Sequence, residues 1–256
     1  MKDLSRRTFL KKVSLSSATL ACLPVIKSVA STGELFSKRH LKGGVVILFQ
    51  GDSITDGNWG RNNDPNHRMG HGYAFSIASR VGADYPEKDY HFYNRGISGN
   101  KVIDLEKRWQ TDTIDLKPDV LSILVGVNDA ASVVTHWEPE VPLGTFDEIY
   151  DSLLAQIMLL FPDVLLVLGE PFIAKGSRTI DNWDAYQTDV QQRQNIVRKL
   201  AQKYNAVFVG YQEVFDQAFE KASVEYWIWD GVHPTVAGHE LMAREWLKQV
   251  GKRIVF

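Results

Sequence analysis

The sequence predicts an α/β fold, a three-layer α/β/α sandwich around a five-stranded parallel sheet. The chain has 256 residues and is 44% hydrophobic, which is enough to bury the core of one large domain. Short apolar runs of strand length alternate with longer stretches in which apolar residues recur at helical spacing. Such alternation is typical of strand–helix units, whose strands form a parallel sheet covered by helices on both faces.

Five segments are expected to form the strands of this sheet. Each is a short run rich in apolar and β-branched residues, and turn-forming residues follow most of them. In chain order they are Val45–Gln50, Tyr90–Asn94, Val120–Gly126, Val164–Gly169 and Ala206–Gly210. This pattern favours a flavodoxin-like sheet, in which the functional site lies beyond the carboxyl ends of the strands.

Three further stretches show the periodicity of helices that bury one face. The residues on these faces are Ile149, Tyr150, Leu153, Leu154 and Ile157 in the first, Tyr186, Val190, Val197, Leu200 and Tyr204 in the second, and Met242, Ala243, Trp246, Leu247 and Val250 in the third. His239 lies one turn before Met242, so we expect it to be a packed structural histidine.

Residues 1–30 are expected to be an export signal, which leaves residues 31–256 as the mature domain. Ser5–Lys11 has the paired arginines of a twin-arginine motif, and the apolar stretch that follows is too interrupted by serine and threonine for a good membrane span. Small residues at positions 28 and 30 favour cleavage before Ser31. The protein is then periplasmic or secreted, with no stable membrane span once the signal is removed. An ordinary amphipathic N-terminal helix is the alternative.

Cys22 is the only cysteine, so the chain can form neither an intrachain disulfide nor a cysteine-based metal cluster. Thr19–Cys22 loosely resembles a lipoprotein processing site, which leaves open a lipid anchor on Cys22. We favour a cysteine that is discarded with the signal. The sequence also leaves open whether the chain forms a homo-oligomer.

The distribution of charge argues against nucleic acid as a partner. Residues 1–30 carry six basic side chains and one acidic one, whereas the rest of the chain carries 23 basic and 30 acidic side chains. The mature domain is therefore acidic, and it has no basic stripe of the kind that nucleic-acid-binding proteins present.

Four polar segments are expected to lie at the carboxyl edge of the sheet, where the functional site is predicted. They are Gly51–Gly57, Asn94–Asn100, Gly126–Asp129 and Asp230–Pro234. In this order they resemble the conserved blocks of the SGNH (GDSL) hydrolases, and the resemblance extends over about residues 45–250. The Gly-Ile-Ser-Gly-Asn block and the segment Trp229–His239 are most similar to the acetyl-xylan esterase type. This resemblance implies the SGNH hydrolase fold and the removal of short acyl groups, above all acetyl, from oligo- or polysaccharides, without a cofactor.

The resemblance also implies catalytic roles for single residues. Ser53 corresponds to the nucleophile, and Asp230 and His233 complete a triad. The backbone amides of Ser53 and Gly99 and the side-chain amide of Asn128 correspond to the oxyanion hole. These roles suit the chemistry, because a serine hydroxyl needs a base to attack an ester, a carboxylate can orient that base, and pre-placed donors stabilise the oxyanion.

Other side chains near these blocks have competing interpretations. Ser53 and Asp230 could simply cap local structure, and Asp129 is expected to brace its loop. His67 and His71 are spaced like metal ligands, but neighbouring glycines break the helix such a pair needs, so we predict no metal site. Trp229 and Trp59 are predicted to bind substrate, since a broad ring can line an acyl pocket or stack on a sugar.

Two other functional classes are less well supported. An α/β-hydrolase would carry a Gly-x-Ser-x-Gly motif, which is absent, and a flavodoxin-type binding module would have no triad. Within the esterases, the alternative is a lysophospholipase, a broad acyl esterase or a thioesterase. Such an enzyme needs an extended apolar groove for a long acyl chain.

Overall fold

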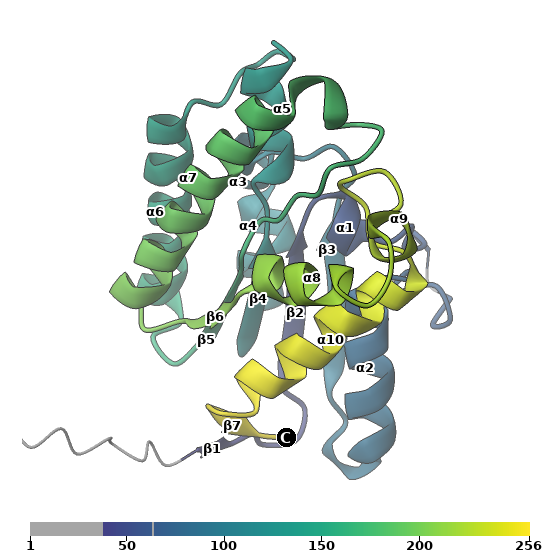
Figure 1. Ribbon diagram of the computed structural model, residues 1–256. Helices are drawn as coiled ribbons and strands as arrows, with labels where there is room; N and C mark the ends of the chain where they lie inside the picture. The colour runs from purple at the N-terminus through teal and green to yellow at the C-terminus, as the bar shows by residue number, and fades with distance from the viewer. Residues whose placement is uncertain (1–37, 63) are drawn as a thin grey trace, which may run out of the picture. The chain divides into compact units, whose positions relative to one another are not determined.

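The computed structural model describes residues 38–62 and 64–256, which form a five-stranded parallel sheet between two layers of helices (Figure 1). The strands are β2 (Val46–Gly51), β3 (His91–Gly96), β4 (Val120–Leu124), β5 (Leu165–Gly169) and β6 (Val207–Val209), and their spatial order is β3-β2-β4-β5-β6. This is the flavodoxin-like order, with the first strand of the sheet between the second and the third. The predicted fold class is confirmed.

The ends of the strands differ from prediction by one or two residues. β4 stops at Leu124 because the backbone turns toward the next helix at Gly126, where φ is +135°. β3 continues to Gly96 because its register with β2 is kept up to the pair Gly51 and Gly96. Every residue of β4 and β5 is buried, as expected for central strands that helices cover on both faces.

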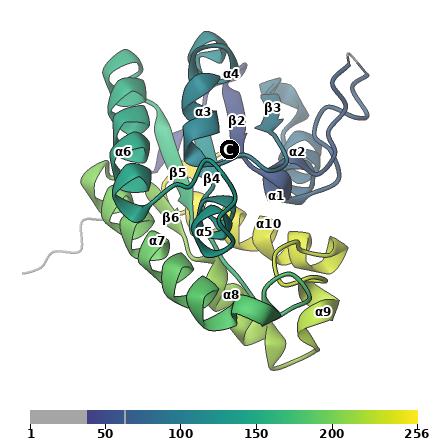
Figure 2. The same cartoon turned by 90° about the horizontal axis from the view of Figure 1, so that it is seen from above.

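Helices α2 (Tyr73–Asp84), α8 (Tyr211–Phe219) and α10 (Val236–Val250) pack on one face of the sheet, and α3 (Val102–Lys107), α6 (Leu143–Leu160) and α7 (Trp183–Lys203) pack on the other. Seen from above, α6 lies beside α7 on one side and α2 beside α10 on the other (Figure 2). The three stretches of predicted helical periodicity are thus confirmed as parts of α6, α7 and α10.

The remaining elements are short. They are α1 (Ser53–Asp56), α4 (Trp109–Asp112), α5 (Val127–Val134), α9 (Val224–Trp227), the 3-10 turns Pro86–Lys88, Ile114–Leu116 and Ile180–Asn182, and the parallel pair β1 (Arg39–His40) and β7 (Ile254–Val255). Two of them, α1 and α5, begin directly beyond β2 and β4, so they hold the residues that follow the strand ends.

Buried polar contacts lock the last helix onto the rest of the domain. The indole of Trp246 is fully buried in the sheet-facing core and donates to Ser122 Oγ in β4 at 3.0 Å. His239 is also buried, and its Nδ1 accepts the backbone N–H of Tyr73 at 3.1 Å. The structure therefore confirms that His239 is a packed structural residue, which connects the start of α10 to the start of α2.

The expected export signal, the cleavage position before Ser31 and Cys22 all lie outside the described residues. Among residues 38–62 and 64–256, no helix combines the length and the apolar character that a membrane crossing requires.

Candidate active site

Ser53 lies at the sharp turn between β2 and α1. Gly51 just before it has φ +154°, and a Cβ at this position would come within 2.2 Å of the carbonyl oxygen of Leu124. Only glycine fits this close approach of two strands. Asp52 then caps α1, because its Oδ1 accepts the backbone N–H of Ile54 at 3.0 Å. The turn leaves Ser53 half-buried at the carboxyl edge of the sheet.

Ser53, His233 and Asp230 form a continuous chain of hydrogen bonds. Ser53 Oγ is 2.9 Å from His233 Nε2, and His233 Nδ1 is 2.7 Å from Asp230 Oδ2. The sequence distance between Ser53 and His233 is 180 residues, so the fold brings these groups together. The imidazole can accept the serine proton on one nitrogen while the other nitrogen donates to a carboxylate, the arrangement that activates a serine nucleophile.

The Asp230 carboxylate is buried and fully engaged. Its side chain is 1% exposed, and its Oδ1 accepts the backbone N–H groups of Val232 at 3.0 Å and His233 at 2.7 Å. Burial would raise the pKa of Asp230, but the hydrogen bonds from the His233 ring and from these two amides outweigh it and lower the pKa to about 2. The carboxylate therefore stays ionised at neutral pH and fixes the orientation of the imidazole.

Arg178 provides a further contact to the same carboxylate, and its guanidinium is positively charged. Its Nε lies 2.8 Å from Asp230 Oδ2, and its side chain is 62% exposed. The backbone around it also meets this loop, since Arg178 donates its N–H to the carbonyl of Asp230 at 3.0 Å. Nothing in the sequence marks Arg178 as part of the site, because it comes from the irregular segment between β5 and α7.

Asn128 contacts the turn that carries Gly99. Asn100 N–H donates to the carbonyl of Ile97 at 3.1 Å, which closes a turn, and Gly99 occupies the turn with φ +83°, where glycine is favoured. Asn128, in the first turn of α5, donates from Nδ2 to the carbonyl of Asn100 at 3.1 Å. An amide nitrogen has two N–H groups, so one remains available for another acceptor.

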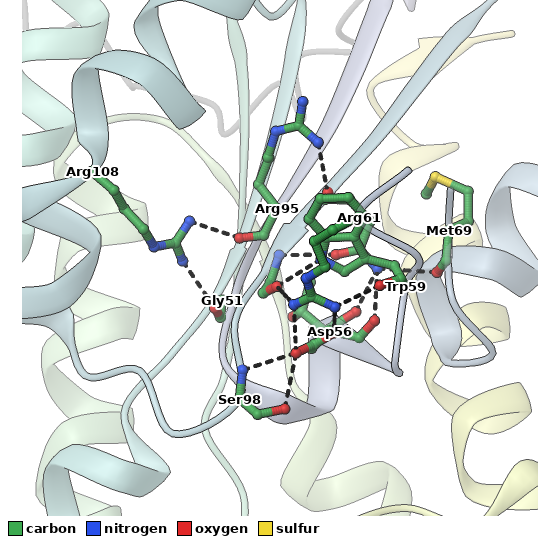
Figure 3. A network of polar contacts seen from close by, with 11 residues as sticks. Gly51, Asp56, Trp59, Arg61, Met69, Arg95, Ser98 and Arg108 are labelled. Atoms are coloured by element: carbon green, nitrogen blue, oxygen red, sulfur yellow. Dashed lines mark hydrogen bonds and ion pairs between the residues drawn. The ribbon is translucent and has the colours of Figure 1, made fainter. Parts of the chain in front are cut away.

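A polar network holds the turn that carries Gly99. Asp56 Oδ2 accepts both the backbone N–H and the hydroxyl of Ser98 at 2.9 Å, and the same carboxylate receives two N–H groups of Arg61 at 2.9 Å each. Trp59 adds a bond from its indole N–H to the carbonyl of Gly96 at 2.8 Å. Figure 3 shows Arg61 between Asp56 and the Trp59 ring, with Ser98 on the opposite side of the carboxylate.

The Asp56 carboxylate in this network stays ionised, because its hydrogen bonds offset the cost of burying its charge. Burial would raise the pKa of Asp56, but the hydrogen bonds from Arg61 and Ser98 lower it below its usual value. The sequence placed Asp56 and Ser98 within two of the four polar segments but indicated no role for either, and it did not single out Arg61. The only signal for Arg61 was its closeness in the sequence to the first of these segments.

The predicted substrate-binding tryptophans lie in different surroundings. Trp229 is 56% exposed, and its ring stacks on the imidazole of His233 with 6.2 Å between ring centroids. Trp59 already contacts Arg61 and Arg95 through its ring, as well as Gly96 through its N–H. The structure thus places Trp229 against the candidate base and Trp59 beside the turn rather than at Ser53.

A third tryptophan lies beside the Gly99 turn. A Cβ built on Gly99 would meet the ring of Trp137 at 3.7 Å, and the buried Lys101 ammonium lies 4.4 Å from the centroid of that ring. Lys101 Nζ also donates to the carbonyl of Pro139 at 2.8 Å, which ties the Trp137 loop to the residue after the turn. Trp137 is 43% exposed, so its ring can contact a bound molecule.

Three other residues considered from the sequence are Asp129, His67 and His71. Asp129 is fully buried and its Oδ1 accepts the backbone N–H of Val102 at 2.9 Å, so it braces the start of α3 as expected. His67 and His71 lie in the segment before α2, where His67 is 3.5 Å from Asp64. Within the part of the chain that the structure describes, no three histidine, cysteine or acidic side chains form a group that could hold a metal ion.

A flavodoxin-like sheet with a serine–histidine–aspartate array beyond its first strand is the architecture of a carboxylic ester hydrolase. Residues 49–241 match the GDSL-like lipase/acylhydrolase family, and the chain belongs to this family. An acetylxylan esterase from Geobacillus stearothermophilus is 33% identical over 213 residues, which cover 81% of this chain and 94% of that protein.

Solved structures agree with this family. A crystal structure of Axe2, the acetylxylan esterase of G. stearothermophilus, superimposes with a TM-score of 0.73 at 32% identity and covers 82% of this chain and 95% of its own. A protein from Parabacteroides merdae described as a GDSL-like lipase gives a TM-score of 0.79 at 37% identity, with coverage of 84% and 100%.

Further structures of Axe2 are of variants at single residues. In three of them, which are described as catalytic mutants, a serine, an aspartate or a histidine is replaced by alanine, and the histidine follows the aspartate by three positions. In another, the tryptophan directly before that aspartate is replaced by isoleucine.

Proposed function

We propose that this protein is a serine esterase that removes acetyl groups from acetylated oligo- or polysaccharides. The hydrogen-bonded chain from Ser53 through His233 to Asp230 carries this proposal, because it joins a nucleophile, a base and an orienting carboxylate at one edge of the sheet. Asp230 and His233 also have the spacing of the aspartate and histidine replaced in the catalytic mutants of Axe2.

In the first half of the reaction, Ser53 Oγ attacks the carbonyl carbon of the acetyl ester while His233 Nε2 takes the serine proton. The carbonyl oxygen becomes an oxyanion, which the backbone N–H groups of Ser53 and Gly99 and the second N–H of Asn128 stabilise. Collapse of this intermediate breaks the bond to the sugar oxygen. His233 gives its proton to that oxygen, so the sugar leaves with a free hydroxyl and Ser53 carries the acetyl group.

In the second half, water attacks the acetyl-serine carbonyl as His233 accepts one of its protons. The same donors stabilise the second oxyanion, and its collapse releases acetate while His233 returns the proton to Ser53 Oγ. Asp230 remains ionised throughout, since the pKa of its carboxyl is about 2. It stabilises each transient imidazolium without receiving a proton.

The surroundings of the triad favour a small acyl group on a carbohydrate. The Trp229 ring stacks on the candidate base His233, and the Trp137 ring borders the candidate oxyanion donor Gly99, so rigid rings lie beside two of the groups that the ester must reach. Such rings limit the length of the acyl group and offer flat faces to a pyranose. Acetylxylan esterase activity in the relatives supports the same substrate class.

A series of p-nitrophenyl esters from acetyl to decanoyl tests the acyl preference, and acetate release from acetylated xylooligosaccharides tests the carbohydrate. We expect kcat/KM to be highest for acetyl and to fall beyond propionyl, with the same rates in EDTA. An apolar groove would instead gain about 0.8 kcal/mol for each methylene buried. A maximum at octanoyl or longer, or no acetate from any acetylated sugar, would favour the lysophospholipase alternative.

We further propose that the enzyme is exported through the twin-arginine motif, to which Arg6 and Arg7 belong. Replacing both with lysine keeps the charge but removes the motif, so precursor should accumulate in the cytoplasm. Normal export of this variant would point to the general secretory route, and an acylated Cys22 at the mature N-terminus would support the lipoprotein alternative.

A further inference from the structure

A pocket of about 540 Å³ lies beside the candidate active site, against the edge strand β3. Its walls come from the segment Trp59–Asn62 and Arg68, from β3 and from Asp112 in α4. Ile97 also lines it, and the carbonyl of Ile97 closes the turn that carries Gly99. The pocket and the candidate oxyanion donor thus share one turn of the chain.

The lining of this pocket is strongly basic, although the chain as a whole has a net charge of −2. Three arginines, Arg61, Arg68 and Arg95, line it together with one carboxylate, Asp112. Asp56 neutralises Arg61 through two bonds of 2.9 Å. Arg68 is exposed and forms no ion pair with any described residue. Positive charge therefore remains without a close partner in the pocket.

Asp112 does not balance this charge, because a fourth arginine competes for it. Arg108 approaches Asp112 at 3.1 Å, whereas Arg95 remains 3.9 Å away. Burial lowers the pKa of Arg108, its bonds to Asp112 oppose that change, and the positive charge of Arg95 lowers the pKa further. The two guanidinium groups thus repel each other, and an anion beside Arg95 would relieve this repulsion.

Aromatic rings hold Arg95 in a fixed orientation. Its guanidinium carbon lies 5.2 Å from the centroid of the Trp59 ring and 5.5 Å from that of Tyr93, and its side chain is 25% exposed. Figure 3 shows its guanidinium pointing away from the Asp56 network. Arg95 Nη1 donates one N–H to the carbonyl of Asn94 at 3.2 Å. A guanidinium carries five N–H groups, so others remain available to a carboxylate.

We propose that this pocket binds the carboxylate of a uronic acid unit on the same acetylated polysaccharide that occupies the candidate active site. The inference rests on the proposed function and names the type of polysaccharide. A carboxylate matches the fork of Arg95 and can also meet Arg68, while the aromatic walls suit the sugar ring. The volume suits one sugar unit, and a neutral sugar would leave the excess charge unpaired.

The test uses two acetylated xylooligosaccharide pools of matched length and acetyl content, one with and one without a uronic acid branch. We expect the wild type to have a kcat/KM on the order of tenfold higher for the branched pool, mainly through a lower KM, as charged hydrogen bonds typically provide. Reducing the branch carboxyl to an alcohol keeps the ring but removes the charge, and it should abolish the preference. High salt should weaken it.

The variants Arg68→Gln and Arg95→Gln should bring the ratio of the two kcat/KM values close to one. Arg68 is exposed, so its replacement cannot disturb the fold. Arg244→Gln is the matched control, since Arg244 is an exposed arginine of α10 that pairs with Glu240, and it should keep the wild-type ratio. Equal values for both pools in the wild type, or a preference that survives both variants, would overturn the proposal.

A separate binding measurement distinguishes this proposal from the proposed function. Calorimetry of the Ser53→Ala protein with a deacetylated, uronic acid-branched oligosaccharide should show binding that Arg95→Gln weakens, whether or not the enzyme releases acetate. If neither pool yields acetate but this binding persists, the acetyl esterase proposal fails and the carboxylate pocket stands. Absence of binding in this measurement refutes the pocket.

Discussion

The loop Asp230–His233 and the turn around Gly99 supply the two halves of the candidate site, but they are held in opposite ways. The Asp230 carboxylate binds the backbone of Val232 and the backbone and ring of His233, so the hydrogen bonds that it makes within the loop join residues two or three positions apart, while Arg178 contacts it from outside the loop. The Gly99 turn depends on Asp56, whose bonds to Ser98 span 42 residues.

This difference in how the two halves are held explains why a sequence motif describes the contacts of one half and not those of the other. When the side chains that contact each other are close together in the sequence, a short motif can describe the contact. Asp-Gly-Val-His therefore indicates both the residues and the contact between Asp230 and His233. A turn that is held from outside does not specify what holds it. Four variants test whether the two halves are as separate in function as in construction, ordered from the largest expected effect on catalysis to the smallest.

Ser53→Ala acts where the two halves meet and should have the largest effect. The loss of the nucleophile is expected to lower kcat by a factor on the order of 10 000 or more, as in other serine hydrolases. The hydroxyl's only hydrogen bond in the described structure is to His233, so thermal unfolding should change little. Substantial residual turnover of acetyl esters by this variant would disprove the nucleophile assignment.

Asn128→Ala removes a donor from the side of the Gly99 turn. We expect kcat to fall about 100- to 1000-fold with little change in KM, because the oxyanion exists only along the reaction path. Asn128 also donates to the carbonyl of Asn100, so circular dichroism and a melting curve must show an intact fold. An increase in KM alone would make Asn128 a substrate-binding residue.

Asp56→Asn leaves every reacting group in place but weakens the support of the turn. Asparagine can still accept one bond from Ser98, yet it loses the ion pair with Arg61, so we expect kcat to fall on the order of tenfold. Stability should fall by about 1–3 kcal/mol. Asp56 would then be a positioning residue, which acts on kcat through the geometry of Gly99.

The control for this variant is Asp151→Asn. Asp151 pairs with Lys203 on the surface between α6 and α7, far in the chain from both blocks. Its replacement should leave kcat and KM unchanged and cost less than about 1 kcal/mol of stability. If Asp56→Asn loses stability but keeps the wild-type kcat, the network is structural and does not position the turn.

The sequence was sufficient for the fold and for the parts of the site at strand ends. Apolar runs of strand length predicted all five strands, because the buried strands of a parallel sheet are apolar on both faces. The rule that functional groups gather at the carboxyl edge then brought the segments of Ser53 and Asn128 together, whereas His233 lies between α9 and α10 and its role came from the family resemblance. The strand ends were predicted less accurately. A glycine with positive φ, such as Gly126, ends a strand through backbone geometry that the sequence alone does not show.

The supporting residues could not be predicted, because tertiary contacts select them. Arg178 reaches Asp230 from a segment without regular structure. The substrate-binding role of Trp59 stays a prediction. The folded chain turns its ring toward Arg61 and Arg95.

Asp52→Asn should affect stability far more than turnover, because Asp52 is buried and caps α1. Its Oδ1 caps α1 and its Oδ2 has no partner among the described residues. Burial raises the pKa of Asp52 to about 7, the bond from Ile54 and the charge of His233 lower it in part, and Asp129 raises it further. The folded protein therefore keeps this carboxyl protonated at a pH where the unfolded chain, with a usual pKa of 3.8, has lost the proton.

The sign of the pH dependence follows from this difference. Below about pH 4 both states hold the proton, and Asp52 contributes no pH dependence to the free energy of unfolding. Between about pH 4 and pH 7 only the folded state holds it, so the contribution of Asp52 destabilises the fold progressively as the pH rises, and it levels off above pH 7. Asparagine can cap α1 in the same way but cannot ionise. Urea unfolding of both proteins from pH 4 to pH 8 should show that the stability of Asp52→Asn relative to the wild type increases with pH. A constant difference across this range would mean that Asp52 ionises normally inside the fold.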